Sequence, residues 1–143
     1  MKKTIFIGGI FLIIIFSIIY FLNVKRKILV INGNEIKVEI ADTFETRYKG
    51  LSNRDNLCED CGMLFAFNEK DTRTFVMRDM KFGLDIIWIA DGRIVKIDEN
   101  LPAEGFAPKI MYSSTSPVDM VLEVNEGYCY KKGIKLDDFV AMK

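Results

Sequence analysis

The chain has 143 residues, of which half are hydrophobic and 28% are charged, so a single globular domain is expected and a disordered chain is excluded. Histidine is absent, which removes imidazole metal ligands and every nucleophile that depends on a histidine base. The 20 basic and 20 acidic residues cancel, but residues 1–27 hold five basic residues and no acidic one. Residues 28–143 are therefore acidic overall, which is untypical of a protein that binds nucleic acid.

The first predicted element is a transmembrane helix, because residues 4–24 contain no charged side chain. About 20 residues at about 1.5 Å per residue cross the roughly 30 Å apolar layer of a bilayer. A cleaved signal peptide is the alternative, but its apolar region is usually about 7–15 residues and ends in a small-residue cleavage site, which this segment lacks. We therefore expect residues 1–27 to form a membrane anchor with basic flanks and residues 28–143 to form the folded domain. Basic residues flank the apolar segment almost equally, so charge alone does not fix its orientation.

After the anchor, short apolar stretches separated by turn residues predict a mostly β domain. The predicted strands cover residues 28–31, 35–40, 63–67, 72–77, 85–90, 93–97, 119–124 and 139–142, with turns at 32–34 and 68–71 and a long loop over 99–117. A short helix is expected over 43–49, with Asp42 and Glu45 as its capping box and Gly50 as its end. A second short helix is expected over 127–132. Many short strands of this kind predict an all-β sandwich or barrel.

The strongest local signal is the dipeptide Asp91-Gly92, which predicts a type I′ hairpin turn. A two-residue turn fixes the strand register and would place Asp85 opposite Asp98 on one side of the sheet. Such a pair needs a cation, which Arg78 or Lys81 upstream could supply; the alternative is that both carboxylates lie in water at the end of the sheet. The buried side of this hairpin would then consist of Ile86, Trp88, Val95 and Ile97.

Four sequence blocks resemble the domain of unknown function 192 family, an uncharacterised family of bacterial and archaeal proteins that are often exported. The blocks are Arg47–Leu51 followed by Arg54, Gly62–Phe67, Phe75–Ile89 and Val121–Gly127, in matching order over about residues 36–140. Val76 and Gly83 depart from the pattern, since the family usually has tryptophan and commonly has proline there. The resemblance implies a compact jelly-roll-like β-sandwich with one or two short helices and no known activity. It also favours a single-pass protein of the cell membrane, with its N-terminus inside and its domain extracytoplasmic.

The three cysteines are Cys58 and Cys61 in a C-x-x-C motif and Cys129 far along the chain. A redox-active pair needs a cation or a helix N-terminus to lower a thiol pKa, whereas Glu59 and Asp60 lie between these two cysteines. Three cysteines without histidine leave a tetrahedral zinc site incomplete, so neither a metal nor another cofactor is predicted. Outside the cytoplasm a structural disulfide between Cys58 and Cys61 is expected, with inert thiols as the alternative.

The candidate ligand-binding residues are the charged residues inside the four blocks: Arg47, Arg54, Arg78, Asp79, Asp85 and Glu123. Arginine forks bind carboxylate or phosphate groups through two parallel hydrogen bonds. Glu123 lies between two apolar strand residues, where a carboxylate must either face water or meet a cation. An internal ion-pair network is the structural alternative for the whole set. Asp79 and Asp85 would form the acid/base pair of an enzyme, although no spacing demands that role.

Three hypotheses from different classes follow. The first is a membrane-anchored extracytoplasmic module that binds an unknown small ligand or protein partner through the arginine and aspartate cluster, with the lipid bilayer as a partner of residues 4–24. The second is a small enzyme with a carboxylate pair and an arginine clamp, and the third is a purely architectural module. We favour binding over catalysis. A pocket that joins the arginines and aspartates would support the first two hypotheses, and a closed ion-pair network would support the third.

Overall fold

A computed structural model describes residues 25–143, so the predicted transmembrane segment at residues 4–24 lies outside the described chain. Within residues 25–143, no helix has the length and apolar character that a bilayer-spanning segment needs. The elements of this part are β1 (Arg26–Ile31), β2 (Asn34–Ala41), α2 (Phe44–Lys49), β3 (Cys61–Asp71), β4 (Thr74–Phe75), β5 (Leu84–Ala90), β6 (Arg93–Leu101), β7 (Tyr112–Ser113), β8 (Val118–Asn125), α3 (Tyr128–Lys132) and β9 (Val140–Met142).

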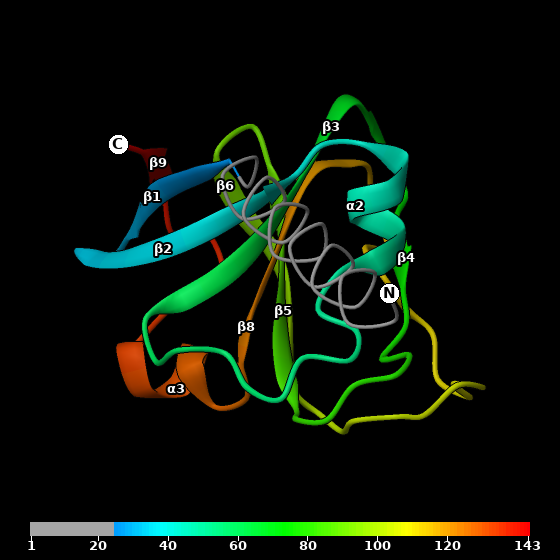
Figure 1. The fold of residues 1–143 in the computed structure, drawn as a ribbon. Coiled ribbons are helices and arrows are strands. Elements are labelled where there is room, and N and C mark those ends of the chain that lie inside the picture. The colour runs from blue at the N-terminus through cyan, green and yellow to red at the C-terminus, as the bar shows by residue number, and fades with distance from the viewer. Residues whose placement is uncertain (1–24) are drawn as a thin grey trace, which may run out of the picture.

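Seven of these strands form one curled mixed sheet in the order β6-β5-β8-β3-β2-β1-β9, and β4 pairs with β7 in a small second sheet (Figure 1). The two ends of the large sheet approach each other. The Val140 amide donates to the Gly92 carbonyl at 2.8 Å, and the Ile94 amide donates to the Asp138 carbonyl at 3.1 Å. The domain is therefore mostly β, as predicted, and its large sheet has the shape of a half-barrel.

The expected jelly-roll sandwich of antiparallel sheets is replaced by this single mixed sheet, because β2 and β3 run parallel. Val38 lies beside Gly62, and Ile40 lies beside Leu64. A parallel pair requires a crossover connection of about a dozen residues or more, and residues 42–60 supply it. The short helix predicted over 43–49 is thus part of a crossover between two neighbouring strands.

Both predicted helices are present, but the cap of the first differs from the expectation. Thr43 caps α2: its hydroxyl accepts from the Thr46 amide at 3.2 Å, and the Thr46 hydroxyl accepts from the Thr43 amide at 3.1 Å. The capping box is therefore formed by two threonines one residue further along than Asp42 and Glu45. Gly50 ends the helix, as expected.

The hairpin turn at Asp91-Gly92 is confirmed, since both residues have the positive φ of a type I′ turn (53° and 70°). The predicted register holds only for the first two residue pairs of the hairpin. Beyond them, Trp88 pairs with Lys96 in place of Val95, because a β-bulge inserts one extra residue into β6. Val95, expected in the core, is consequently 39% exposed.

The bulge places Asp85 and Asp98 on opposite sides of the sheet, so the predicted pairing of these carboxylates is wrong. Asp98 lies opposite Ile86 and accepts a hydrogen bond from the Trp88 indole at 2.7 Å. Asp85 precedes Ile86 along β5 and therefore points to the other side. Ile97, expected beside Trp88, packs instead against the core on the side of Asp85.

Three further predicted boundaries are wrong. β3 continues through the predicted turn at residues 68–71, because after an irregularity Asp71 pairs with Val118 of β8. The predicted strand over 72–77 shortens to β4, which pairs only with β7. The predicted loop over 99–117 contains the end of β6 and all of β7.

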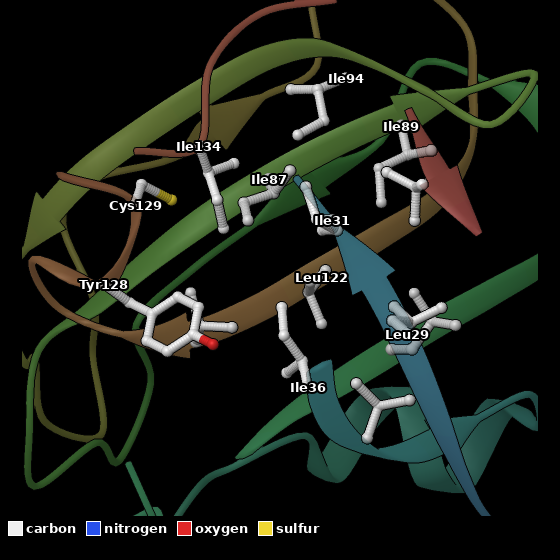
Figure 2. Close-up of a cluster of buried hydrophobic side chains, with 14 residues drawn as sticks. Leu29, Ile31, Ile36, Ile87, Ile89, Ile94, Leu122, Tyr128, Cys129 and Ile134 are labelled. Carbon is white, nitrogen blue, oxygen red and sulfur yellow. The ribbon is translucent and has the colours of Figure 1, made fainter. Parts of the chain in front are cut away.

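Two apolar cores fill the two sides of the large sheet. The inner core receives side chains from all seven strands and from α3, and Figure 2 shows it: Leu29, Ile31, Ile36, Val38, Leu64, Ile87, Ile89, Ile94, Leu122, Val124, Tyr128, Cys129, Ile134 and Val140. The outer core consists of Ala41, Leu51, Met63, Phe65, Met77, Leu84, Ile86, Trp88, Leu101, Val118 and Val121. Since β5 contributes to both cores, it is buried on both faces.

Candidate functional site

A cavity of about 520 Å³ lies over the outer core, between α2, β3 and β4. Its size falls within the range of roughly 300–1,000 Å³ that is typical of small-molecule sites. The wall combines aromatic rings with arginines and one carboxyl group: Phe44, Tyr48, Phe65, Phe67, Phe75, Arg47, Arg73, Arg78 and Glu123. This mixture of apolar surface with a few convergent polar groups is typical of a ligand pocket.

The three arginines of the cavity are held by main-chain carbonyls and aromatic rings. Arg47 donates from Nη1 to the carbonyls of Asp42 (2.8 Å) and Ala66 (2.9 Å), and Arg73 donates from Nη2 to the Glu69 carbonyl (2.8 Å). Both guanidinium groups lie over the Phe67 ring, at 5.1 and 4.1 Å from its centroid. These contacts fix the planar groups in place and leave other N–H donors of each fork for a ligand.

These arginines lack the close carboxylate partner that several other cations of residues 25–143 have. Arg54, for example, forms a salt bridge with Glu39 at 2.7 Å. In the part of the chain that the structure describes, no salt bridge within 4.0 Å joins Arg47 or Arg78 to a carboxylate, and Arg73 reaches only Asp71 at 4.0 Å. The Arg73 Nε atom is buried without a hydrogen-bond partner. An anion in the cavity would supply the missing negative charge.

Glu123 is the acidic residue of the cavity wall. It lies in β8, between Met63 of β3 and Ile86 of β5, and it is only 5% exposed. Burial raises the pKa of its carboxyl group to about 8, although the charge of Arg54 acts in the opposite direction. The group is therefore protonated at neutral pH, and its O–H can donate a hydrogen bond.

The structure brings three of the six predicted site residues together, since Arg47, Arg78 and Glu123 all line the cavity. Arg54 lines a neighbouring cavity of about 230 Å³, where it donates two hydrogen bonds to Glu39, at 2.9 and 2.7 Å. The hydrogen bonding with Arg54 is the main reason why the pKa of Glu39 is lowered. Neither Asp79 nor Asp85 lines the large cavity.

Asp85 belongs to the inner side of the sheet, where it acts as a structural acceptor. Its Oδ1 atom accepts from the amides of Asn100 (2.8 Å) and Gly127 (3.1 Å), and its Oδ2 atom accepts from the amide of Cys129 (2.9 Å). The carboxylate thereby ties the end of β6 and the start of α3 to β5. With Asp79 and Asp85 apart from the cavity, the expected acid/base pair does not assemble there.

Asp85, Glu99 and Cys129 bring three possible metal-ligand atoms within 4.8 Å of one another. Two features argue against a metal ion at this place. The Asp85 oxygens are already engaged by three amides, and burial raises the pKa of the Cys129 thiol, whereas metal ligation requires the thiolate.

The cysteines pair as the sequence predicts: Cys58 and Cys61 form a disulfide with a Cα–Cα distance of 5.1 Å. Cys129 is free and buried. The disulfide lies at the start of β3, and the adjacent Asp60 forms a salt bridge with Lys132 at 2.7 Å. It therefore closes the crossover loop near α3, away from the residues of the large cavity.

Tyr48 and Arg73 are among the cavity residues that were not singled out from the sequence. Tyr48 is 64% exposed on α2, so no burial pattern marks it. Arg73 lies outside the four blocks, and its position depends on β3 continuing through residues 68–71, where a turn was expected. Only the arrangement of β3, β4 and α2 in space reveals that both residues face one cavity.

Comparisons with known proteins extend these observations. A family model described as DUF192 (Uncharacterized ACR, COG1430) matches residues 27–142. A solved structure of a proposed transcription regulator from Sinorhizobium meliloti 1021 is 30% identical, with a TM-score of 0.77, and the match covers 83% of this chain and 95% of that one. A protein of unknown function from Novosphingobium aromaticivorans DSM 12444 is 31% identical, with a TM-score of 0.76 and coverages of 82% and 86%. Among curated proteins no match is found.

Proposed function

The chain belongs to the DUF192 family, and from the geometry of its cavity we propose that the domain binds a small organic anion and is held at a membrane by residues 4–24. The observation that carries this proposal is the position of Arg47 and Arg78 and the set of contacts that they make. Both guanidinium groups line the cavity, both lie over aromatic rings, and no carboxylate of residues 25–143 forms a salt bridge with either one. Guanidinium groups that are held in place without a carboxylate salt bridge are suited to bind an anion that comes from solution.

The rest of the wall indicates the ligand's chemistry. Arginine forks favour a carboxylate or a phosphate group, because their donors match two oxygens at once. The rings of Phe65, Phe67 and Phe75 favour an apolar or planar portion next to the anionic group. Glu123, protonated at neutral pH, would donate to a further oxygen of the ligand. The proposed ligand is thus an organic carboxylate or phosphate with an apolar part.

The proposed membrane attachment and extracytoplasmic location are supported by two features. Residues 4–24 carry no charge, and their length fits an apolar bilayer layer of roughly 30 Å. The disulfide between Cys58 and Cys61 suits an oxidising compartment outside the cytoplasm. Carbonate washing of membranes from expressing cells tests the attachment: an anchored protein stays in the pellet, and recovery in the wash would contradict the anchor.

Binding is tested by the thermal unfolding of the full chain in detergent micelles, with phenyl phosphate and with inorganic phosphate as probes. Phenyl phosphate should raise the unfolding temperature more than inorganic phosphate does, because only the former offers a ring to the aromatic wall. Replacement of Arg47 by Gln should weaken the binding of phenyl phosphate about tenfold, the equivalent of one charge-assisted hydrogen bond.

A matched control for this experiment is Arg93→Gln. Arg93 also lies over an aromatic ring, 6.0 Å from the centroid of Phe139, and donates to the Asp137 carbonyl at 3.0 Å. It does not line the cavity, so its replacement should leave the binding of phenyl phosphate unchanged. Equal weakening by both substitutions, or no stabilisation by either probe, would contradict the proposed site and favour the architectural alternative.

A further inference from the structure

We infer that the exposed face of α2, formed by Phe44 and Tyr48, docks on the surface of an anionic lipid bilayer. This inference rests on the membrane anchor proposed above, and it adds the orientation of the domain relative to the membrane. Three independent features of the described residues point to it: the exposed rings on α2, the place where the chain enters the domain, and the distribution of charge.

The α2 face consists of two aromatic residues that the fold leaves in solvent. The helix contains no buried residue, and Phe44 and Tyr48 are 73% and 64% exposed. They lie four residues apart on one side of the helix, and their rings are stacked with centroids 6.1 Å apart. Aromatic side chains exposed in this way are characteristic of helices that lie in the interface between a bilayer and water.

The chain enters the domain beside this face. Lys25, which directly follows the apolar segment, forms a salt bridge with Asp42 at 2.6 Å. Asp42 precedes Phe44 by two residues, a span of at most about 7 Å. Lys25 and Lys49, at the far end of α2, also line the same small cavity. A bilayer that holds residues 4–24 would therefore lie next to α2.

Basic residues are concentrated in the segment of the chain that contains α2. Residues 25–54, which include β1, β2 and α2, hold seven basic and four acidic residues, whereas residues 55–143 hold 11 basic and 16 acidic ones. Among the acidic residues near the α2 face, Asp42 is paired with Lys25, and Glu45 lies in the first turn of the helix. The segment of the chain that contains α2 is thus net positive, which favours its approach to negative lipid headgroups.

Docking in this orientation would also define where the anion of the proposed function comes from. Tyr48 belongs both to the docking face and to the cavity wall, and Arg78 lies over its ring. The cavity would consequently open toward the headgroup layer, and its anionic ligand would reach it from the membrane surface.

The docking is tested with the full chain reconstituted in vesicles of phosphatidylcholine alone or mixed with phosphatidylglycerol. Trp88 is fully buried, so it supplies a constant background fluorescence. In Phe44→Trp the new indole should be quenched several-fold more strongly by a lipid with a nitroxide near its headgroup than the indole in Tyr130→Trp. Tyr130 is the matched control, because it is 89% exposed and lies on α3, at the other side of the domain from α2 (Figure 1).

Stronger quenching of Phe44→Trp, increased by phosphatidylglycerol, would support the docking. Equal quenching of the two variants in protein that resists carbonate washing would overturn the docking and leave the anchor intact. Release of the protein by carbonate would overturn both the anchor and the docking. Neither result affects the binding of phenyl phosphate in micelles, so the anion site succeeds or fails by its own measurement.

Discussion

The guanidinium group of Arg78 lies 4.1 Å from the centroid of the Tyr48 ring and donates a hydrogen bond to the Tyr48 carbonyl oxygen at 2.7 Å. This double contact joins the segment after β4 to α2, a helix without buried residues of its own. Arg78 therefore has two tasks in the fold: it holds α2 against the cavity, and it presents its remaining donors to the cavity interior.

Arg78 provides a test of whether a planar fork or only a positive charge is needed for anion binding. Arg78→Lys retains the charge but loses the stacked, two-point geometry, whereas Arg78→Gln loses both. We expect phenyl phosphate binding to weaken about threefold in the first variant and about tenfold in the second, as measured by titration calorimetry in micelles. A lysine variant that binds as tightly as the original protein would show that the fork geometry does not matter.

Glu123 should make the stability of the domain depend on pH. Burial raises its pKa from an ordinary value of 4.5 to about 8, so between these values the folded chain holds a proton that the unfolded chain has released. The free energy of unfolding should therefore fall with rising pH across this range, by up to about 1.4 kcal/mol per pH unit. Urea unfolding of the full chain in micelles at a series of pH values measures this slope.

Glu123→Gln removes the titrating proton and should flatten this pH dependence. The free energy of unfolding of the variant should therefore increase relative to that of the original protein as the pH rises. Glu69→Gln is the matched control, because Glu69 is exposed and uses only its carbonyl oxygen to bind Arg73. It should leave the slope unchanged. A slope that persists in Glu123→Gln would mean that another group carries the pH dependence.

Elements that depend on neighbouring residues could be predicted from the sequence. The turn at Asp91-Gly92, the helix that ends at Gly50 and the apolar strand that became β8 each follow from residues close together in the chain. The parallel pairing of β2 with β3 could not be predicted in this way, because no local pattern records which distant strand will lie alongside.

The candidate site, too, could be predicted from the sequence only in part. The sequence indicated Arg47, Arg78 and Glu123 as charged residues of the four blocks, and all three line the cavity. Asp85 was assigned to the same cluster because it lies inside one of the four blocks, and a register without a bulge placed it beside Asp98. One extra residue at Val95 reverses the side to which the distant part of the hairpin points, and the turn itself carries no sign of that insertion.

Asp85 should contribute strongly to stability through its three amide partners. Asp85→Ala would leave the buried amide of Cys129 and the partly buried amides of Asn100 and Gly127 without their acceptor, at a cost of about 1–3 kcal/mol for each hydrogen bond. We expect the free energy of unfolding to fall by at least about 3 kcal/mol in urea denaturation. Asp55→Ala, which removes an exposed pair with Lys81, should cost much less, because solvent screens that pair. Comparable losses in the two variants would contradict the structural role of Asp85.

The number of cysteines that react with a thiol reagent should differ between the folded protein, the unfolded protein, and the reduced and unfolded protein. Cys58 and Cys61 are joined in a disulfide, and Cys129 is buried, with the pKa of its thiol raised mainly by that burial. The folded protein should therefore react slowly or not at all with dithionitrobenzoate, because neither an accessible thiol nor a thiolate is present. Unfolding in urea should release one reactive thiol, and unfolding with prior reduction should release three, in agreement with the three cysteines of the chain. Two rapidly reacting thiols in the folded protein would show that the disulfide is absent, whereas one would show that α3 opens readily and exposes Cys129.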